Sequence, residues 1–405
     1  MKIAVLGYGT VGSGVVEVLM TNAESIAKKA ATPLDVKYIL DLRDFDESPF
    51  KEKFVKDINL ILNDEEVDII AEAMGGIHPA YDFVRGALEK GKSVVTSNKE
   101  LVAAYGPELL EIAKENHCNF LFEASVGGGI PIIRPLNSAL TADEIYEITG
   151  ILNGTTNFIL TKMKVESRTF EDVLKEAQEL GYAEKNPEAD VEGHDACRKI
   201  AILASLALGE YVDYKDIDTQ GITKIKKEDM EYASHMGYSI KLLASCKREA
   251  EGIYASVKPM MIPNHHPLAP VSDVFNAVLV KGNMVGDVMF YGRGAGKLPT
   301  ASAVVADIID AAKHKDTNIM CFWSREKLEI QSNENEHAQY FVRLKGDPIY
   351  IKAIVEEVFK DTQSVAALAP NEYAFITACE TLKSLQEKLG QLKDVEVMSK
   401  ICIKK

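Results

Sequence analysis

The sequence predicts an α/β protein in which a doubly wound parallel sheet is followed by an α+β region and a C-terminal βαββαβ unit. Short apolar segments alternate with amphipathic ones as far as about residue 127, mixed segments follow, and the tail has a strand–helix order of its own. Alternation of this kind is typical of parallel strands covered by helices on both faces. The length of 405 residues agrees with two or three domains, at about 150 residues per domain.

The first part of the chain contains five strand-like runs separated by helical patterns. After the first run, Val11, Val15 and Val18 fall on one face of a helix, as expected for packing on a sheet. The strands are expected at residues 2–6, 36–40, 68–73, 93–96 and 119–123.

Three domains are expected from the changes in this rhythm. The run ASAVVADIIDAA (residues 301–312) is helical and strongly apolar, so we expect it to pack back on the first domain. The polar segment QSNENEH (residues 331–337) lacks a core pattern and is expected to be a linker. The predicted domains are residues 1–127 with 299–330, residues 128–298, and residues 338–405.

The tail has the pattern of a ferredoxin-like unit. Tyr340, Val342 and Leu344 alternate with polar neighbours, as in a half-buried strand. A helix, two strands, a second helix and a last strand are expected after it, which completes the βαββαβ order. These elements are expected at residues 349–359, 364–368, 373–379, 381–392 and 395–403.

Charge and composition exclude some classes of partner. Acidic residues outnumber basic ones by 61 to 46, and because phosphate binding needs a basic surface, nucleic acid is not expected as the main partner. No apolar run approaches the ~20 residues that span a bilayer. The six cysteines form no CxxC pair, and the first strand begins at residue 2 without room for a signal peptide. We therefore expect a cytoplasmic protein that acts on a small molecule.

A glycine-rich turn, GYGTVG, lies between the first strand and the first helix. Gly7 permits a tight turn, Gly9 allows a pyrophosphate to approach the backbone, and Gly12 allows the helix to pack closely on the sheet. Thr10 and Val11 open the helix, whose N-terminus attracts phosphate. The turn predicts a Rossmann-type dinucleotide-binding domain, and the alternative is an ordinary turn.

Two charges after the second strand bear on the choice of dinucleotide. Asp41 favours a free ribose 2′-hydroxyl and therefore NAD, whereas Arg43 can hold a 2′-phosphate and therefore NADP. Either could instead be an ordinary loop charge. The sequence leaves NAD and NADP open.

Two further segments are expected at the cofactor. Ser97 and Lys99 follow the strand at residues 93–96, and the carboxyl ends of parallel strands line the ligand crevice. Gly294 lies in GRGAGKLPT (residues 292–300), a glycine-rich turn that opens a helix and is expected to close over the cofactor. The alternative for Lys99 is a solvated loop lysine.

A candidate proton relay lies in the segment GYAEKNPEADVEGHDACRK (residues 181–199). Asp195 and Lys199 are four residues apart, so they share one face of a helix that continues into an apolar run. A lysine at the edge of buried surface, beside a carboxylate, can transfer a proton. Spacing alone slightly favours the alternative, a surface ion pair worth only a few tenths of a kcal/mol.

Taken in order, these segments resemble those of homoserine dehydrogenase. The resemblance implies a nucleotide-binding domain, a catalytic and dimerisation domain, and a C-terminal ACT-like domain. It also implies a homodimer or homotetramer active in threonine, methionine and isoleucine synthesis. The matching segments are GYGTVG, TSNK, EASVGGGIPII, ILNGTTNFIL, GYAEKNPEADVEGHDACRKIAILA and GAGKLPTASAVVAD.

The resemblance assigns a reaction and the roles of several side chains. The reaction is reversible hydride transfer between NAD(P)H and L-aspartate 4-semialdehyde, which gives L-homoserine. Lys199 matches the proton donor, Asp195 would orient it, and Lys99 would face the same crevice. Glu184 and Asp190 would hold the substrate ammonium.

The resemblance also implies a substrate turn and a structural sodium site. Gly154 and Thr155 match the turn that holds the substrate. The sodium ligands would be a carboxylate and three backbone carbonyls, those of Glu123, Val126, Gly128 and Ile130.

Two departures and two rival functions remain open. The family often has a basic residue where this chain has Asp41, and Gly346-Asp347 stands where ACT domains often have Pro-Gly, so the effector is undetermined. One rival is a dehydrogenase of a related amino-acid aldehyde. The other is a catalytically silent amino-acid sensor, which would have no need to retain Lys99, Asp195 and Lys199 together.

Overall fold

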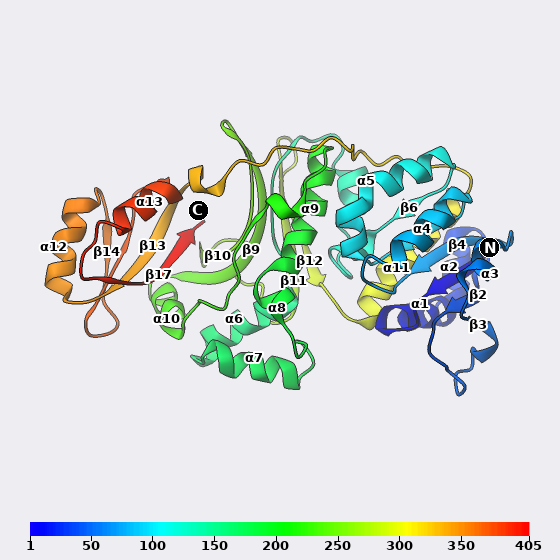
Figure 1. Cartoon of the computed structure of the whole chain (residues 1–405), viewed down its shortest axis with the longest axis horizontal. Coiled ribbons are helices and arrows are strands. Elements are labelled where there is room, and N and C mark those ends of the chain that lie inside the picture. Colours follow the sequence, from blue (N-terminus) through cyan, green and yellow to red (C-terminus); the bar gives the residue numbers. More distant parts are fainter. Residues whose placement is uncertain (405) are drawn as a thin grey trace. The chain divides into compact units, whose positions relative to one another are not determined.

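A computed structural model describes residues 1–404 of the chain, which form two compact units (Figure 1). Unit 1 consists of Met1–Ile145, Arg198–Tyr214 and Gly282–Leu328. Unit 2 consists of Tyr146–Cys197, Lys215–Lys281 and Glu329–Lys405. The three-domain division expected from the sequence remains a prediction.

Unit 1 is built on a six-stranded sheet in which every neighbouring pair is parallel. The order β3-β2-β1-β4-β5-β6 reverses between β1 and β4, and in such sheets ligands bind at the carboxyl ends of the strands beside this reversal. The doubly wound fold is therefore confirmed. The strands are β1 (Lys2–Leu6), β2 (Asp35–Leu40), β3 (Phe54–Val55), β4 (Val67–Glu72), β5 (Ser93–Thr96) and β6 (Phe120–Leu121).

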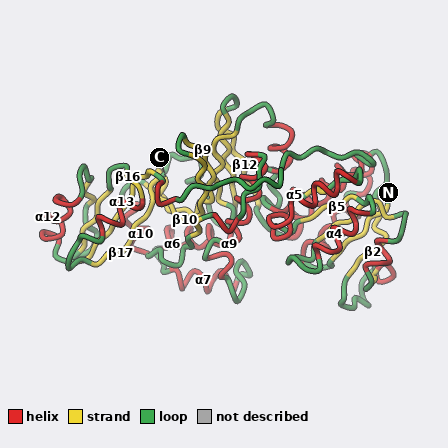
Figure 2. The backbone as a smooth tube through the Cα atoms, turned by 45° about the horizontal axis from the view of Figure 1, so that its top comes forward, coloured by secondary structure: helices red, strands yellow, loops and turns green. Residues whose placement is uncertain are grey.

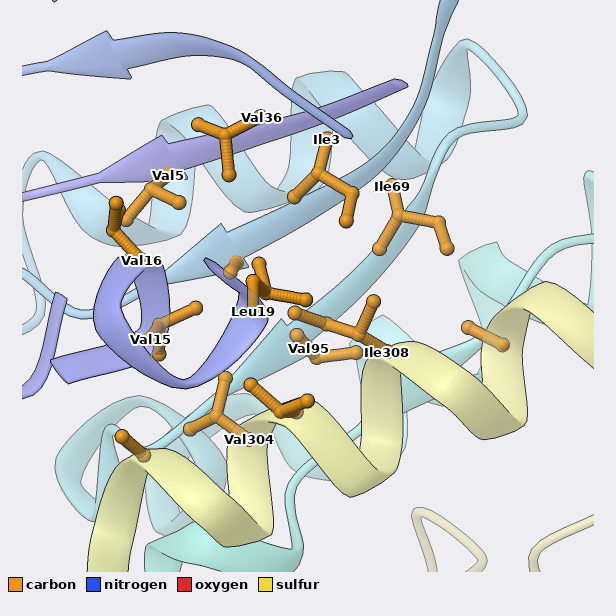
Figure 3. Close-up of a cluster of buried hydrophobic side chains, with 14 of the residues drawn as sticks. Ile3, Val5, Val15, Val16, Leu19, Val36, Ile69, Val95, Val304 and Ile308 are labelled. Carbon is orange, nitrogen blue, oxygen red and sulfur yellow. The ribbon is translucent and has the colours of Figure 1, made fainter. Parts of the chain in front are cut away.

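Helices α1 and α11 cover one face of this sheet and share its core (Figure 3). Val15 and Leu19 of α1 meet Val304 and Ile308 of α11 over buried strand residues. A Cβ at Gly14 would lie 2.9 Å from the Lys297 carbonyl oxygen, so the glycine lets the two helices approach closely. The unit contains α1 (Thr10–Thr21), α2 (Ala23–Ala30), α3 (Ile58–Leu62), α4 (Ala80–Glu89), α5 (Lys99–Glu115), α11 (Lys297–Lys313), strand β12 (Gly286–Arg293), the short helical turns η1 (Lys51–Lys53) and η2 (Glu123–Ser125), and the π-helical turn η3 (Pro135–Ala139).

Unit 2 is built on a larger sheet whose longest pair is the antiparallel hairpin of β9 and β10, twelve residues each (Figure 2). The strands follow the order β11-β7-β9-β10-β17-β13-β15-β14, and β10 pairs with β17 in parallel. The strands are β7 (Ile145–Ile151), β8 (Asp218–Thr219), β9 (Tyr238–Glu249), β10 (Gly252–Pro263), β11 (Phe275–Gly282), β13 (His337–Lys345), β14 (Gln363–Val365), β15 (Glu372–Ile376), β16 (Glu380–Thr381) and β17 (Glu396–Ile403).

The tail strands follow the ferredoxin-like order expected from the sequence. In the order β17-β13-β15-β14, the last strand of the tail lies beside the first, and α12 and α13 connect the strands. Its apolar residues share one core with the β9–β10 region. The helices and helical turns that belong wholly or partly to unit 2 are α6 (Gly154–Glu166), α7 (Phe170–Glu179), α8 (Glu188–Val191), α9 (His194–Leu208), η4 (Tyr214–Asp216), α10 (Lys227–His235), η5 (Asn333–Asn335), α12 (Pro348–Val358) and α13 (Leu382–Leu389).

The segment 331–337, expected to be a linker, is held along β10. The Gln331 amide donates to the Ile253 carbonyl at 2.8 Å, and Asn333 Nδ2 donates to the Ala255 carbonyl at 2.8 Å. The two donors thus pair with backbone carbonyls of β10. The polar composition of the segment does not indicate that it pairs with a strand.

No helix within residues 1–404 is long and apolar enough to cross a membrane.

Candidate active site

The glycine turn joins β1 to α1 beside the reversal of strand order. Gly7 has φ +89°, which favours glycine, and a Cβ at Gly12 would lie 1.8 Å from the Gly7 carbonyl oxygen. A Cβ at Gly9 would meet no atom within 4 Å. The first turn of α1 has no acidic residue and no side-chain cap, so its positive end is available to an anion.

Asp41 and Arg43, which the sequence treats as opposing indicators, form an ion pair. Arg43 Nε and Nη2 donate to the Asp41 carboxylate at 3.0 and 2.9 Å, and the Tyr8 amide donates to it at 2.8 Å. The Arg43 guanidinium holds the pKa of Asp41 well below its usual range. The Arg43 guanidinium also lies 5.2 Å from the centre of the Phe45 ring. The structure therefore places both charges beside the glycine turn.

Glu72, the last residue of β4, is a site residue that the sequence reasoning missed. Its side chain is buried, and it accepts hydrogen bonds from Thr96 Oγ1 and from the amide of Met74 at 2.7 Å. Burial raises the pKa of this carboxyl. The carboxyl ties the loop after β4 to the end of β5. The one available signal was an acidic residue directly after the apolar residues Ile69, Ile70 and Ala71.

The segment after β5 is ordered by Asn98. The Asn98 side chain accepts from the Leu101 amide at 3.2 Å, which caps α5, and donates to the Gly76 carbonyl at 2.6 Å. Ser97 and Lys99 flank it and are partly exposed, and Lys99 is the first residue of α5. Both therefore lie at the edge of the sheet that the sequence predicts.

Gly294 lies in a loop that packs against a second glycine loop. A Cβ at Gly128 would lie 2.3 Å from the Gly294 carbonyl oxygen, and the Gly129 amide donates to the Arg293 carbonyl at 3.1 Å. The loop continues through Gly296, with φ +120°, into α11, whose first turn has no acidic residue. Gly294 therefore precedes a helix N-terminus, as expected.

Glu123 is buried and organises the chain that follows it. One of its carboxylate oxygens accepts from the amides of Ile132 and Ile133 at 2.6 and 2.8 Å, and the other accepts from the amide of Arg134 at 2.8 Å. Nearby in the chain, Val126, Gly128 and Ile130 are buried as well.

The segment at residues 126–130 offers backbone carbonyl oxygens close in sequence to the Glu123 carboxylate. Oxygen ligands suit hard cations, so the loop has the donor chemistry of a cation site. The described residues 1–404 contain no cluster of three or more His, Cys, Asp or Glu side chains that could hold a metal.

A polar cluster in unit 2 is centred on Asn153. Asn153 Nδ2 donates to Asp190 Oδ1 at 2.7 Å and to Asp195 Oδ2 at 3.0 Å. Its Oδ1 accepts from the Thr156 amide at 2.9 Å, which caps α6. The structure therefore brings together two carboxylates that the sequence singles out, through an amide whose bridging role the sequence did not indicate.

The predicted substrate turn follows this cluster directly. A Cβ at Gly154 would lie 2.9 Å from the Val274 carbonyl oxygen, so a side chain has no room there. Thr155 Oγ1 donates to the Tyr182 carbonyl at 2.7 Å. Glu184 lies nearby in sequence on an exposed loop, where its backbone carbonyl accepts from Gln178 Nε2 at 3.0 Å.

Asp195 and Lys199 both belong to α9, and they are 5% and 8% exposed, respectively. This burial argues against a surface ion pair, whose side chains would be largely exposed. The catalytic roles of the two residues stay a prediction. A buried lysine four residues after a buried carboxylate is suited to proton transfer.

Comparison with known proteins gives consistent matches. Residues 131–309 match the family model "Homoserine dehydrogenase", and residues 7–123 match "Homoserine dehydrogenase, NAD binding domain". Homoserine dehydrogenases of Bacillus subtilis and Helicobacter pylori are each 42% identical, over 85% and 98% of this chain and 81% and 99% of their own lengths.

Solved structures agree with these matches. The homoserine dehydrogenase of Thiobacillus denitrificans superposes with a TM-score of 0.91 at 36% identity, over 100% of this chain and 98% of its own. A hyperthermophilic archaeal homoserine dehydrogenase in complex with NADPH has a TM-score of 0.65 at 30% identity, over 76% of this chain and 97% of its own.

Proposed function

We propose that Lys199, Asp195 and Lys99 carry the proton transfer of this chain, which belongs to the homoserine dehydrogenase family. The chain is an NAD(P)-dependent oxidoreductase that interconverts L-aspartate 4-semialdehyde and L-homoserine. When bound, the nicotinamide cofactor supplies the hydride to the aldehyde carbon. The aldehyde oxygen then becomes an alkoxide that needs a proton. The observation that carries the proposal is the buried Asp195–Lys199 spacing on α9, with Asp195 fixed by Asn153.

Each of the three residues has a distinct role in this proposal. Lys199 Nζ gives a proton to the alkoxide oxygen. Asp195 is a positioning residue, since its carboxylate is held by Asn153 and provides a negative charge one helical turn before the lysine. Lys99 places a second positive charge at the carboxyl end of β5, where it would stabilise the developing negative charge.

Asp190 and Glu184 would hold the substrate ammonium. Asp190 is oriented by its hydrogen bond to Asn153, and Glu184 lies on the loop before it. Gly154 and Thr155 form the first turn of α6, whose positive end suits the substrate carboxylate.

The assay that tests the function follows NADPH or NADH oxidation with L-aspartate 4-semialdehyde. We expect oxidation with equal formation of homoserine, and a large fall in kcat/KM for succinic semialdehyde, which lacks the amino group. Equal use of both aldehydes would favour a dehydrogenase of another aldehyde. No turnover with either would favour the silent sensor.

We propose that Arg43 selects NADPH and that Asp41 allows NADH. The Asp41–Arg43 pair can serve either cofactor. The Arg43 guanidinium can turn from Asp41 to a 2′-phosphate, and the Asp41 carboxylate can accept a hydrogen bond from a ribose hydroxyl. Arg43→Ala is expected to lower kcat/KM for NADPH by about 10- to 100-fold, the range of a charge-assisted hydrogen bond, and to leave that for NADH within about twofold. Arg85→Ala, on the exposed face of α4, is the matched control. Equal losses with both cofactors would refute the proposal.

We propose that the loop at residues 126–130 binds a structural sodium ion with Glu123. The buried Glu123 carboxylate and the backbone carbonyls of the buried residues Val126, Gly128 and Ile130 support this assignment, because oxygen ligands suit hard cations. At equal ionic strength, the unfolding temperature is expected to be a few degrees higher in sodium chloride than in choline chloride, because a cation that binds only the folded state stabilises it. Glu123→Gln should remove the difference, and the exposed Glu115→Gln should keep it. Equal unfolding temperatures of the unsubstituted protein in the two salts would contradict the site.

We also propose the domain organisation and assembly. The tail is assigned as an ACT-like domain on its strand order, with residues 1–127 and 299–330 as the cofactor domain and 128–298 as the catalytic and dimerisation domain. A second copy of the chain would cover Met289 and Tyr291 of β12, which are exposed. Sedimentation equilibrium of the full chain tests this, and a monomer would exclude it.

A cytoplasmic role in threonine, methionine and isoleucine synthesis completes the proposal. It is supported by the family of the chain and by its cysteines, none of which forms a disulfide within residues 1–404.

A further inference from the structure

We propose that a cavity of about 310 Å³ in unit 2, between α6 and β9, binds a small oxyanion, either inorganic phosphate or the carboxylate of a small molecule. The site is separate from the residues proposed for catalysis, and it does not depend on the proposed function. Its lining residues are Leu160, Thr161, Lys164, Val165, Ser239, Ile240, Lys241, Asn264, Ala269, Pro270 and Ser272.

Lys241 is the central group of this cavity. It is only 5% exposed, and its ammonium donates to the Val271 carbonyl and to Asn157 Oδ1 at 3.1 Å. An ammonium has three donors, so one remains after these two contacts. Burial, together with the smaller effect of the neighbouring Lys164 charge, lowers the pKa of Lys241 to about 8.

Lys164 brings a second positive charge to the same cavity. Its Nζ donates to Ser239 Oγ at 2.6 Å, and Ser239 Oγ in turn donates to Asn264 Oδ1 at 2.8 Å. Two donors of this ammonium therefore remain. Ser239 and Lys241 are two residues apart on β9 and point to the same side of the strand.

The positive charges of the cavity lack a matching negative one. None of the eleven lining residues is acidic, and neither lysine forms a salt bridge within residues 1–404. The carboxylate that acts on Lys241 is that of Asp273, which is exposed and outside the lining. The whole chain carries a formal charge of −15, so a cavity with two lysines and no acid departs from its general character.

An oxyanion would supply the negative charge that the two lysines of the cavity lack. Buried charges are normally paired, and a cavity at the lower end of the ligand-pocket range can hold a small one. The remaining lysine donors can bind its oxygens by charge-assisted hydrogen bonds. Leu160, Val165 and Ile240 would contact the apolar part of a carboxylate ligand.

Calorimetric titration of the full chain tests the proposal. Sodium phosphate and sodium acetate are titrated separately, at constant sodium and ionic strength with chloride as the balancing anion, in the presence of saturating NADP⁺ so that the cofactor site is filled. We expect saturable binding of at least one anion, weakened tenfold or more by Lys164→Met and by Lys241→Met. Lys162→Met, on the same helix but paired with Glu166, should bind the anion as the unsubstituted protein does.

The two anions also distinguish phosphate-bearing ligands from carboxylate ligands. Binding of phosphate alone points to phosphate-bearing ligands, and binding of acetate alone to carboxylates; both outcomes support the site. If Lys241→Met does not fold, Lys164→Met decides, since Lys164 is only half-buried. No saturable binding of either anion, or unchanged binding by Lys164→Met, would overturn the proposal.

Discussion

Replacing Lys199 by methionine is expected to lower kcat by about 10²- to 10⁴-fold, the usual contribution of a positioned proton donor. The alkoxide formed by hydride transfer would then have to take its proton from water. Methionine retains most of the volume of the buried lysine stem, so the helix should keep its packing. Steady-state kinetics with L-aspartate 4-semialdehyde and NADPH measures the effect.

The same variant should keep its affinity for the cofactor. Lys199 is expected to act on the substrate oxygen, so the Kd of NADPH should change by less than about threefold. Lys175→Met, on the exposed face of α7, is the matched control and should leave kcat unchanged. Asp195→Asn should lower kcat less than Lys199→Met does. It should also shift the pH profile of kcat, because it removes the negative charge one helical turn before Lys199. A Lys199→Met enzyme with undiminished turnover would remove the proton-transfer role.

Replacing Arg343 by methionine is expected to lower the free energy of unfolding by about 3–5 kcal/mol, the cost of breaking a buried ion pair. Arg343 is 1% exposed on β13. Its Nη1 lies 2.8 Å from Glu372 Oε1 and its Nε lies 3.1 Å from Asp229 Oδ1. Its Nη2 lies 3.0 Å from the same Asp229 oxygen as an ion pair, without a well-aligned hydrogen bond. Two buried carboxylates would lose their counter-charge.

Denaturant unfolding measures this loss, and two further variants interpret it. Arg325→Met removes an exposed arginine paired with Glu111 and should cost less than about 1 kcal/mol. Adding Asp229→Asn and Glu372→Gln to Arg343→Met should recover much of the stability, because the stranded charges are then gone. A change below 1 kcal/mol for Arg343→Met alone would show that the cluster contributes little.

The cluster also explains how the tail is attached. Asp229 belongs to α10, whereas Arg343, Glu372 and Ser399 belong to tail strands, and Ser399 Oγ donates to Asp229 Oδ1 at 2.7 Å. Tyr232 of α10 adds a hydrogen bond to Glu372 Oε2 at 3.0 Å. The tail is therefore attached to the rest of unit 2 through buried charges as well as through the β10–β17 pairing.

Local patterns were enough to predict much of unit 1. The alternation of strands and helices recovered five of the six strands of its parallel sheet, and the exception was β3, which has only two residues and no periodicity to detect. The glycine turn was predictable because two of its glycines meet constraints set by residues close in sequence: Gly7 has a positive φ, and a side chain at Gly12 would collide with the Gly7 carbonyl.

The candidate site was only partly predictable. Asp195 and Lys199 could be singled out by their spacing, but that spacing could not tell a buried relay from a surface pair. Glu72 was not predicted because its partner Thr96 lies 24 residues away, and the hydrogen bond from Asn153 to Asp195 was not predicted because it spans 42 residues.

By itself, therefore, the sequence determined the strand–helix order, the glycine turn between β1 and α1 and the spacing of the proposed relay, because these depend on neighbours within a turn or a strand. The tertiary structure alone decided which charges are buried and which are paired. Lys199 is buried, Asp41 and Arg43 neutralise each other, and Lys241 lines a cavity without an acid. Desolvation and charge pairing depend on distances in space between segments far apart in the chain, and no local pattern of residues encodes those distances.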